Sequence, residues 1–192
     1  MNTPSHFLMT AALGKALARV PIVKGAFLLG AIAPDLPLWL LSIGGVLYYH
    51  LILGWTWAET ARLMFDDLYF HHPFWIASHN LLHSPLLLLV GIALVRQFRR
   101  YINSWQRWAF WFLTACLFHS TVDIFTHVDD GPLLLFPLNW TLRFHSAVSY
   151  YDGRYYGAIF QQVDLFLNCV FIVYLLYPRL YCFIRGRIFH RH

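Results

Sequence analysis

The chain has 192 residues, of which 59% are hydrophobic and only 12% are charged. Soluble domains carry about 25% charged residues, so this composition and a mean hydropathy of +0.53 exclude an ordinary soluble protein. Several apolar runs are long enough to cross a hydrocarbon layer of about 30 Å. We therefore expect a single domain over residues 1–192, folded as an all-α integral membrane helical bundle.

The net charge of +5 is concentrated in two arginine clusters, each next to the end of an apolar helix. Basic residues in such places are typical of cytoplasmic loops in multi-pass inner-membrane proteins, and this favours a membrane orientation over nucleic-acid binding. The three cysteines lie in apolar segments and predict no disulfide. The two clusters consist of Arg96, Arg99, Arg100 and Arg107, and of Arg179, Arg185, Arg187 and Arg191.

The first helix is expected to begin at Thr3 or Ser5, either of which can cap it, and to end near Ala18. This helix would carry His6 in its opening turn.

A short apolar segment, Gly25 to Ala33, then leads into Pro34-Asp35-Leu36-Pro37. Prolines on both sides of Asp35 predict a break in the helix there. The carboxylate can either cap the next helix, expected over Leu38 to about Trp55, or bind a metal ion.

The middle of the chain predicts one amphipathic and one apolar helix. Glu59 to Phe70 mixes acids with apolar residues and is expected at the membrane interface. From Phe74 we expect a single helix to about Val95, which carries His79 and His83 four residues apart.

The helix expected over Gln106–His127 carries His119, Asp123 and His127 at its end. Residues four apart lie on one face of a helix, about 5–6 Å apart at Cβ, so these three side chains can share a cation. Zinc is the usual ion for such nitrogen and oxygen ligands, and manganese or iron fits as well. The alternative is a structural His–Asp hydrogen bond inside the bundle.

A polar connection over Val128–Gly157 is expected to lead into a last helix, from about Ala158 to Tyr177, with Asp164 near its start. If the arginine clusters are cytoplasmic, the polar groups of three helices gather at the opposite, non-cytoplasmic end. The sequence thus predicts a metal site at one end of the bundle. The residues concerned are His79, His83, His119, Asp123, His127 and Asp164.

Four short motifs in this order resemble the LexA-regulated, membrane-bound metal-dependent hydrolase family. They are an N-terminal histidine, a G-x-x-x-P-D segment, an H-x-x-x-H-S segment and an H-x-x-x-D helix. Two further elements, T-H-x-x-D-G-P and S-x-x-S-Y-x-D, resemble one branch of that family. In this chain the six begin at His6, Gly30, His79, His119, Thr126 and Ser146.

The same order is similar to the zinc-dependent phospholipase C fold, an all-α bundle with a cluster of zinc ions. That similarity implies His6, Asp35, His83, His119 and Asp123 as ligands of one to three ions. The final His-x-x-x-Glu of those phospholipases is missing here, and Asp164 is the nearest substitute.

These patterns predict a membrane-bound metal-dependent hydrolase that acts on a phosphoester, possibly of a lipid, through a metal-activated water. Asp35 or Asp152 would orient or deprotonate that water. Two alternatives remain: a metal-binding membrane protein without catalysis, such as a transporter, and a purely structural bundle. The sequence makes no prediction of the oligomeric state.

Overall fold

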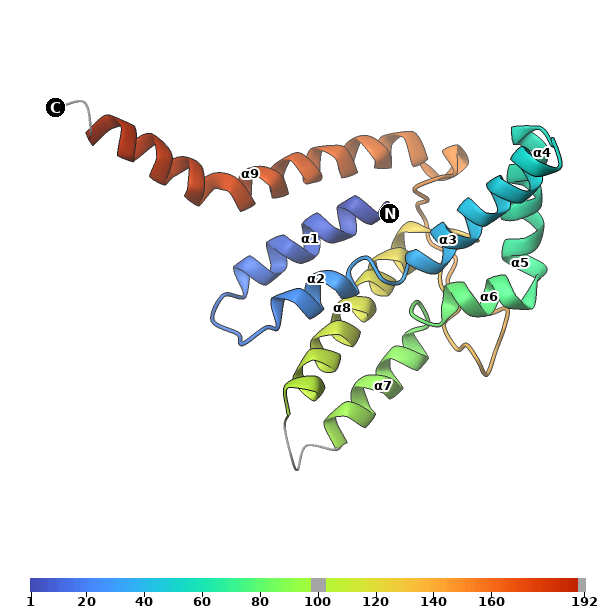
Figure 1. Ribbon diagram of the computed structural model, residues 1–192, viewed down its shortest axis with the longest axis horizontal. Helices are drawn as coiled ribbons and strands as arrows, with labels where there is room; N and C mark the ends of the chain where they lie inside the picture. The colour runs from blue at the N-terminus through green and yellow to red at the C-terminus, as the bar shows by residue number, and fades with distance from the viewer. Residues whose placement is uncertain (98–102, 190–192) are drawn as a thin grey trace.

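The computed structural model describes the backbone of residues 1–97 and 103–189 and the side chains of residues 1–97 and 103–177. All regular secondary structure in this part is helical, which confirms the all-α prediction. Two helices are long and apolar enough to cross a membrane, α8 (Ser104–Thr126) and the first part of α9, Gly157–Tyr177. Helix α9 as a whole covers Gly157–Phe189, and Figure 1 shows its extension away from the other helices.

Helix α1 (Thr3–Ala16) lies beside α9 and begins one turn before its histidine. Its cap is Asn2, whose side chain accepts a hydrogen bond of 2.9 Å from the Ser5 backbone N–H. The prediction of Thr3 or Ser5 as the cap was therefore wrong. Their hydroxyls bond elsewhere, to the carboxylates of Asp35 and Asp164 respectively.

Helix α2 (Lys24–Gly30) packs directly on α8. A Cβ atom at Gly30 would overlap the Phe112 carbonyl oxygen and lie 2.8 Å from the Ala115 Cβ. Only glycine allows the two backbones to approach so closely, and this explains the first residue of the G-x-x-x-P-D segment. The chain then turns through residues 31–35 and brings Asp35 beside the last turns of α8.

Helix α3 (Leu36–Gly45) continues as a π-helical segment, η1 (Val46–Ile52). The chain returns through α4 (Trp57–Arg62), the π-helical η2 (Leu63–Leu68) and the single turn α5 (Tyr69–His71). Figure 1 shows these segments as a hairpin that projects from the bundle. Both expected helices in this region are thus present.

The prediction of a single helix from Phe74 to Val95 was wrong. Two helices are present, α6 (Pro73–Asn80) and α7 (Pro85–Gln97), at an angle of 46°. Pro85 has no N–H for the Leu81 carbonyl, and the chain turns at residues 81–83 instead. The pair counts as a third spanning segment only if the two helices form one bent span.

The connection after α8 is irregular but well anchored. The Leu133 N–H donates to the Asn80 side chain at 2.8 Å, and the Ser84 hydroxyl donates to the Phe136 carbonyl at 2.9 Å. The Tyr69 hydroxyl donates to the Asp130 carbonyl at 2.6 Å. These bonds hold the connection over the ends of α6, α7 and α8.

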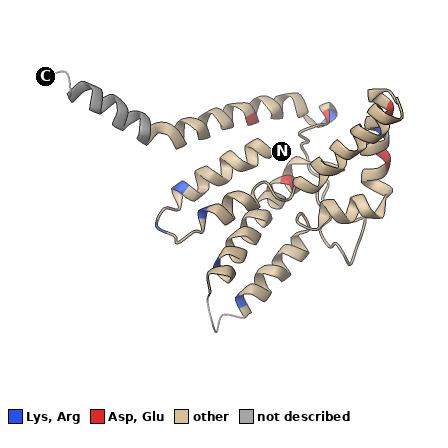
Figure 2. Ribbon diagram, in the orientation of Figure 1, with Lys and Arg blue, Asp and Glu red and all other residues tan. Residues whose placement is uncertain are grey.

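Four basic residues lie at the ends of α1, α2, α7 and α8, where Figure 2 shows blue on one side of the bundle: Lys15, Lys24, Arg96 and Arg107. Other described basic residues lie elsewhere, among them Arg62 in α4 and Arg154 in the 3-10 turn η4 (Gly153–Tyr155). Arg99, Arg100 and Arg191, and the side chains of Arg179, Arg185 and Arg187, lie outside the described part of the chain.

Candidate metal centre

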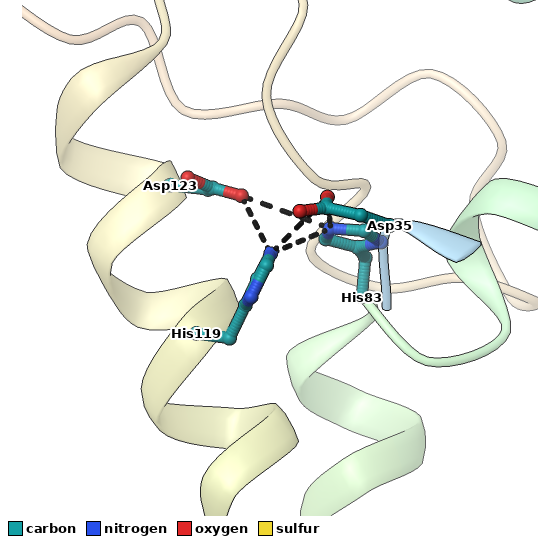
Figure 3. Close-up of side chains that lie close together, drawn as sticks. All are labelled: Asp35, His83, His119 and Asp123. Atoms are coloured by element: carbon teal, nitrogen blue, oxygen red, sulfur yellow. Dashed lines mark hydrogen bonds and ion pairs between the residues drawn. The ribbon is translucent and has the colours of Figure 1, made fainter. Parts of the chain in front are cut away.

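Four of the expected ligands meet at one point, as Figure 3 shows. Asp35 comes from the start of α3, His83 from the turn between α6 and α7, and His119 and Asp123 from successive turns of α8. One nitrogen or oxygen atom from each lies within 4.8 Å of those of the other three. Three of the side chains are buried, and Asp35 is largely so.

The spacing of these atoms fits a small divalent cation. His119 Nε2 lies 3.1 Å from Asp123 Oδ2, 3.4 Å from Asp35 Oδ1 and 3.2 Å from His83 Nε2. His83 Nε2 lies 3.5 Å from Asp35 Oδ1 and 3.7 Å from Asp123 Oδ2. Ligands held about 2.0–2.1 Å from a tetrahedral zinc ion are about 3.3 Å apart, which is close to these five separations.

Two backbone carbonyls orient the imidazole rings. His83 Nδ1 lies 2.9 Å from the His79 carbonyl oxygen, and His119 Nδ1 lies 2.9 Å from that of Ala31. Since a carbonyl only accepts, each Nδ1 carries the proton, and a neutral ring then presents a bare Nε2 to the centre. Two carboxylates and two Nε2 atoms this close together need positive charge between them, which either protons on the Nε2 atoms or a bound cation can supply.

The second oxygen of Asp123 faces a different group of atoms. Asp123 Oδ1 lies 2.9 Å from His6 Nε2 and 3.6 Å from His127 Nε2. The terminal ammonium of Met1 donates to this oxygen at 2.8 Å and lies 2.9 Å from His127 Nε2. The His6 ring also stacks on that of His119, with centroids 3.7 Å apart. Asp123 therefore joins both groups of atoms. The Met1 ammonium lies at the second group, between Asp123 Oδ1 and His127 Nε2.

His6 and His127 thus lie beside the group of four and not in it, and three further candidates lie outside both groups. His79 contributes its carbonyl to His83, while its ring lines the adjoining cavity. Asp164 is buried between α1 and α9, where it accepts a hydrogen bond of 2.7 Å from the Ser5 hydroxyl. Asp152 pairs with Arg154 at 2.6 Å and does not line the cavity.

A cavity of about 670 Å³ adjoins the four residues and is lined by both Asp35 and Asp123. Most of its wall is apolar or aromatic, and it includes two acids that the sequence did not single out, Asp66 and Asp130. The phenol of Tyr151 also lines it. Asp130 stands in the T-H-x-x-D-G-P element, three residues after His127, and this spacing was the signal that could have identified it.

His127 and Asp130 form a pair at the cavity wall, with Nδ1 3.0 Å from Oδ2. Burial lowers the pKa of His127, but hydrogen bonds to Asp123 and Asp130 outweigh it, so the net shift is upward. Burial raises the pKa of the Asp130 carboxyl, and the bond to His127 reverses this, so its net shift is downward. The pair is therefore suited to hold a proton on the imidazole.

The carboxyl of Asp35 is kept ionised by its neighbours. Burial raises its pKa, but hydrogen bonds and charge from His119 and His83 outweigh burial and hold the pKa well below its usual value. Its other oxygen accepts a hydrogen bond from the Thr3 hydroxyl. Asp35 precedes α3, but its side chain makes no cap hydrogen bond. Of the two roles that the sequence left open, helix cap and metal ligand, the structure does not support the cap.

The chain belongs to the YdjM inner membrane protein family, whose model matches residues 1–187. No match was found among curated proteins or among solved structures. The family match agrees with a LexA-regulated membrane protein, and it carries no information on hydrolase or phospholipase activity. Together with the apolar helices, it identifies a membrane protein with a buried His/Asp group that could hold a metal ion.

Proposed function

We propose that this member of the YdjM family is a membrane-bound metal-dependent hydrolase. The ion is a divalent metal, zinc by its ligand set, held by Asp35, His83, His119 and Asp123. The observation that supports this best is the spacing of 3.1–3.7 Å between each imidazole nitrogen and the other ligand atoms, beside a cavity large enough for a substrate. The substrate class is a phosphoester, of a membrane lipid in particular.

A bound divalent ion would lower the pKa of water to near 7 and polarise a phosphoryl oxygen. The chain's own residues supply the remainder of the site. Asp35 stays ionised and fixed by Thr3, so it can orient a water molecule at the cavity end. His127, held by Asp130, can give its proton to a leaving oxygen.

The site would open on the non-cytoplasmic side of a multi-pass protein. In four segments of the chain a basic residue stands at one end and a site residue at the other, with no His, Asp, Glu, Lys or Arg between them. The basic ends match the cytoplasmic side under the positive-inside rule. The four pairs are His6 and Lys15, Lys24 and Asp35, His83 and Arg96, and Arg107 and His119.

The test is metal analysis and chelator-sensitive hydrolysis on one purified preparation. We expect at least one zinc ion per chain and release of phosphate or a phosphorylated headgroup from mixed phospholipids. His119→Ala should lose most of the metal, whereas His145→Ala should keep it because that ring is exposed and pairs with Asp129. Retention of metal by folded His119→Ala would refute the ligand assignment.

A second outcome separates the enzyme from a metal carrier. Wild-type protein with full metal occupancy and no hydrolysis of any phosphoester or acyl ester would refute the hydrolase. The metal-binding protein without catalysis would then be the correct reading.

A further inference from the structure

Part of the connection between α8 and α9, residues 134–144, exposes large apolar side chains, and we call it the apolar loop. Leu138 is 81% exposed. Arg143 is the only charged residue of the loop. Its guanidinium donates to the Gly131 carbonyl and lies 5.5 Å from the centroid of the Tyr69 ring. Both partners line the cavity of the candidate site, so this charge is held against the protein. The large apolar side chains that the loop exposes are Leu135, Leu138, Trp140, Leu142 and Phe144.

Several backbone groups of the apolar loop are hydrogen-bonded within the loop itself. The Leu138 N–H donates to the Leu135 carbonyl at 2.8 Å. The Asn139 side chain accepts from the N–H groups of Thr141 and Leu142 at 2.9 and 2.7 Å. An unsatisfied backbone group costs several kcal/mol in hydrocarbon, and these bonds remove that cost for the donors concerned. The loop is therefore suited to a boundary with lipid, although it is not a helix.

The depth of the loop is fixed at one end by a contact with α7. The Leu86 N–H donates to the Leu134 carbonyl at 3.3 Å. Leu86 precedes Arg96 by ten residues, which is about 15 Å along the helix. Phe136 also belongs to a buried cluster with Ile76 of α6. This end of the loop is thus held at a known distance from the basic end of α7.

The other end of the loop contacts α8. The Phe144 ring packs edge-on against the Phe125 ring, with centroids 5.6 Å apart. Phe125 follows Arg107 by 18 residues, which is about 27 Å along α8. Phe125 is itself 57% exposed on a helix long enough to span a membrane, so the loop continues a surface that faces lipid. Measured from the basic helix ends, both ends of the loop therefore lie within a hydrocarbon layer of roughly 30 Å.

We propose that the apolar loop is seated in the membrane leaflet opposite the basic helix ends, with its exposed apolar side chains in contact with lipid. The sequence predicts a polar connection here, so this placement departs from that expectation. Figure 1 shows the connection reaching past α6 to the side of α7 rather than beyond its end, and lipid surrounds a bundle from the side. Trp140 fits the same boundary, because tryptophan is enriched where hydrocarbon meets water. Gly131 and Pro132 join the loop to the cavity wall, so the seated loop holds the cavity at the membrane surface.

The experiment uses the full chain with its three cysteines replaced by alanine, in nanodiscs of phosphatidylethanolamine and phosphatidylglycerol. A fluorophore is attached to Leu138→Cys, and its quenching is measured with aqueous iodide and with phosphatidylcholine that carries a nitroxide near the ester end of its acyl chains. We expect strong quenching by the nitroxide lipid. Iodide should quench about tenfold less than at a position in water, because an ion is excluded from an apolar layer. Leu142→Cys is a second reporter on the loop and should give the same result.

Two control positions calibrate the quenchers. Gly153→Cys lies in the same connection, where a Cβ meets nothing within 4 Å, and should be quenched by iodide. Phe166→Cys lies on α9, where Phe166 is 67% exposed, and should be quenched by the nitroxide lipid and not by iodide. Because Leu138 is exposed, its replacement removes little packing. Helicity and thermal unfolding of each variant check that the fold is kept.

Two results would overturn the proposal. Iodide quenching at Leu138→Cys as strong as at Gly153→Cys would place the loop in water. Protection of Leu138→Cys from both quenchers would mean that protein, such as a second copy of the chain, covers the loop. The quenching requires neither metal nor turnover, so failure of the proposed hydrolase and failure of the lipid contact are observed separately.

Discussion

Replacing Gly30 by alanine is expected to weaken metal binding, although Gly30 provides no ligand atom. The new methyl group would overlap the carbonyl oxygen of Phe112, which is part of the α8 backbone and cannot rotate away. Helix α2 must therefore shift from α8 by several tenths of an ångström. Such overpacking typically costs about 1–3 kcal/mol of stability.

The shift reaches the metal centre through Ala31, the next residue. Its carbonyl oxygen lies 2.9 Å from His119 Nδ1, and hydrogen bonds of this type extend to about 3.2 Å, so the tolerance is about 0.3 Å. Loss of an outer hydrogen bond to a metal-binding histidine typically lowers affinity about 10–100-fold. We expect a loss of that size for Gly30→Ala.

The assay is zinc competition against a chromophoric chelator, with helicity and thermal unfolding measured on the same samples. Gly44→Ala is the matched control, since it adds the same methyl group to an apolar helix where nothing lies within 4 Å. It should bind zinc as wild type does. A folded Gly30→Ala protein with wild-type zinc affinity would refute the link between the α2–α8 contact and the site.

Three further predictions test residues around the metal centre and the orientation of the chain in the membrane. Asp164→Ala should lower stability by about 1–3 kcal/mol, because it removes a buried acceptor for the side chains of Ser5, Asn2 and Asn168, yet keep the zinc content measured by elemental analysis. Asp152→Asn should retain both zinc and chelator-sensitive turnover, since its carboxylate pairs with Arg154; loss of turnover with zinc intact would restore it as a catalytic candidate. Gly153→Cys in a background without other cysteines should react with an impermeant thiol reagent on intact cells, and labelling only after permeabilisation would reverse the membrane orientation.

The sequence was most informative where helical periodicity alone places side chains. His119 and Asp123 had to share a face of α8, and the Pro-flanked Asp35 had to lie at a break, so three of the four converging residues followed from local rules. His79 and His83 do not both point to the centre, because the chain leaves the helix after Asn80. Pro85 signalled that break, but the apolar run after it favoured continuation of the helix.

Contacts that depend on the irregular segments could not be predicted. Asp130 reaches the cavity because the connection after α8 folds back, anchored by Asn80 and Tyr69 on other helices. The Met1 ammonium reaches Asp123 because Asn2, rather than a later residue, caps α1. Periodicity carries no information on either, since both result from tertiary hydrogen bonds.

The distribution of ionisable groups along the helix axes favours a reaction site over a conduction path. On α8, eleven residues with no His, Asp, Glu, Lys or Arg among them separate Arg107 from His119, a stretch of about 18 Å at 1.5 Å per residue. The stretch between His83 and Arg96 is similar, and α7 packs against α8. An ion that left the Asp35–Asp123 centre toward the basic ends would lose its ligands and cross an apolar layer, at a cost of several kcal/mol.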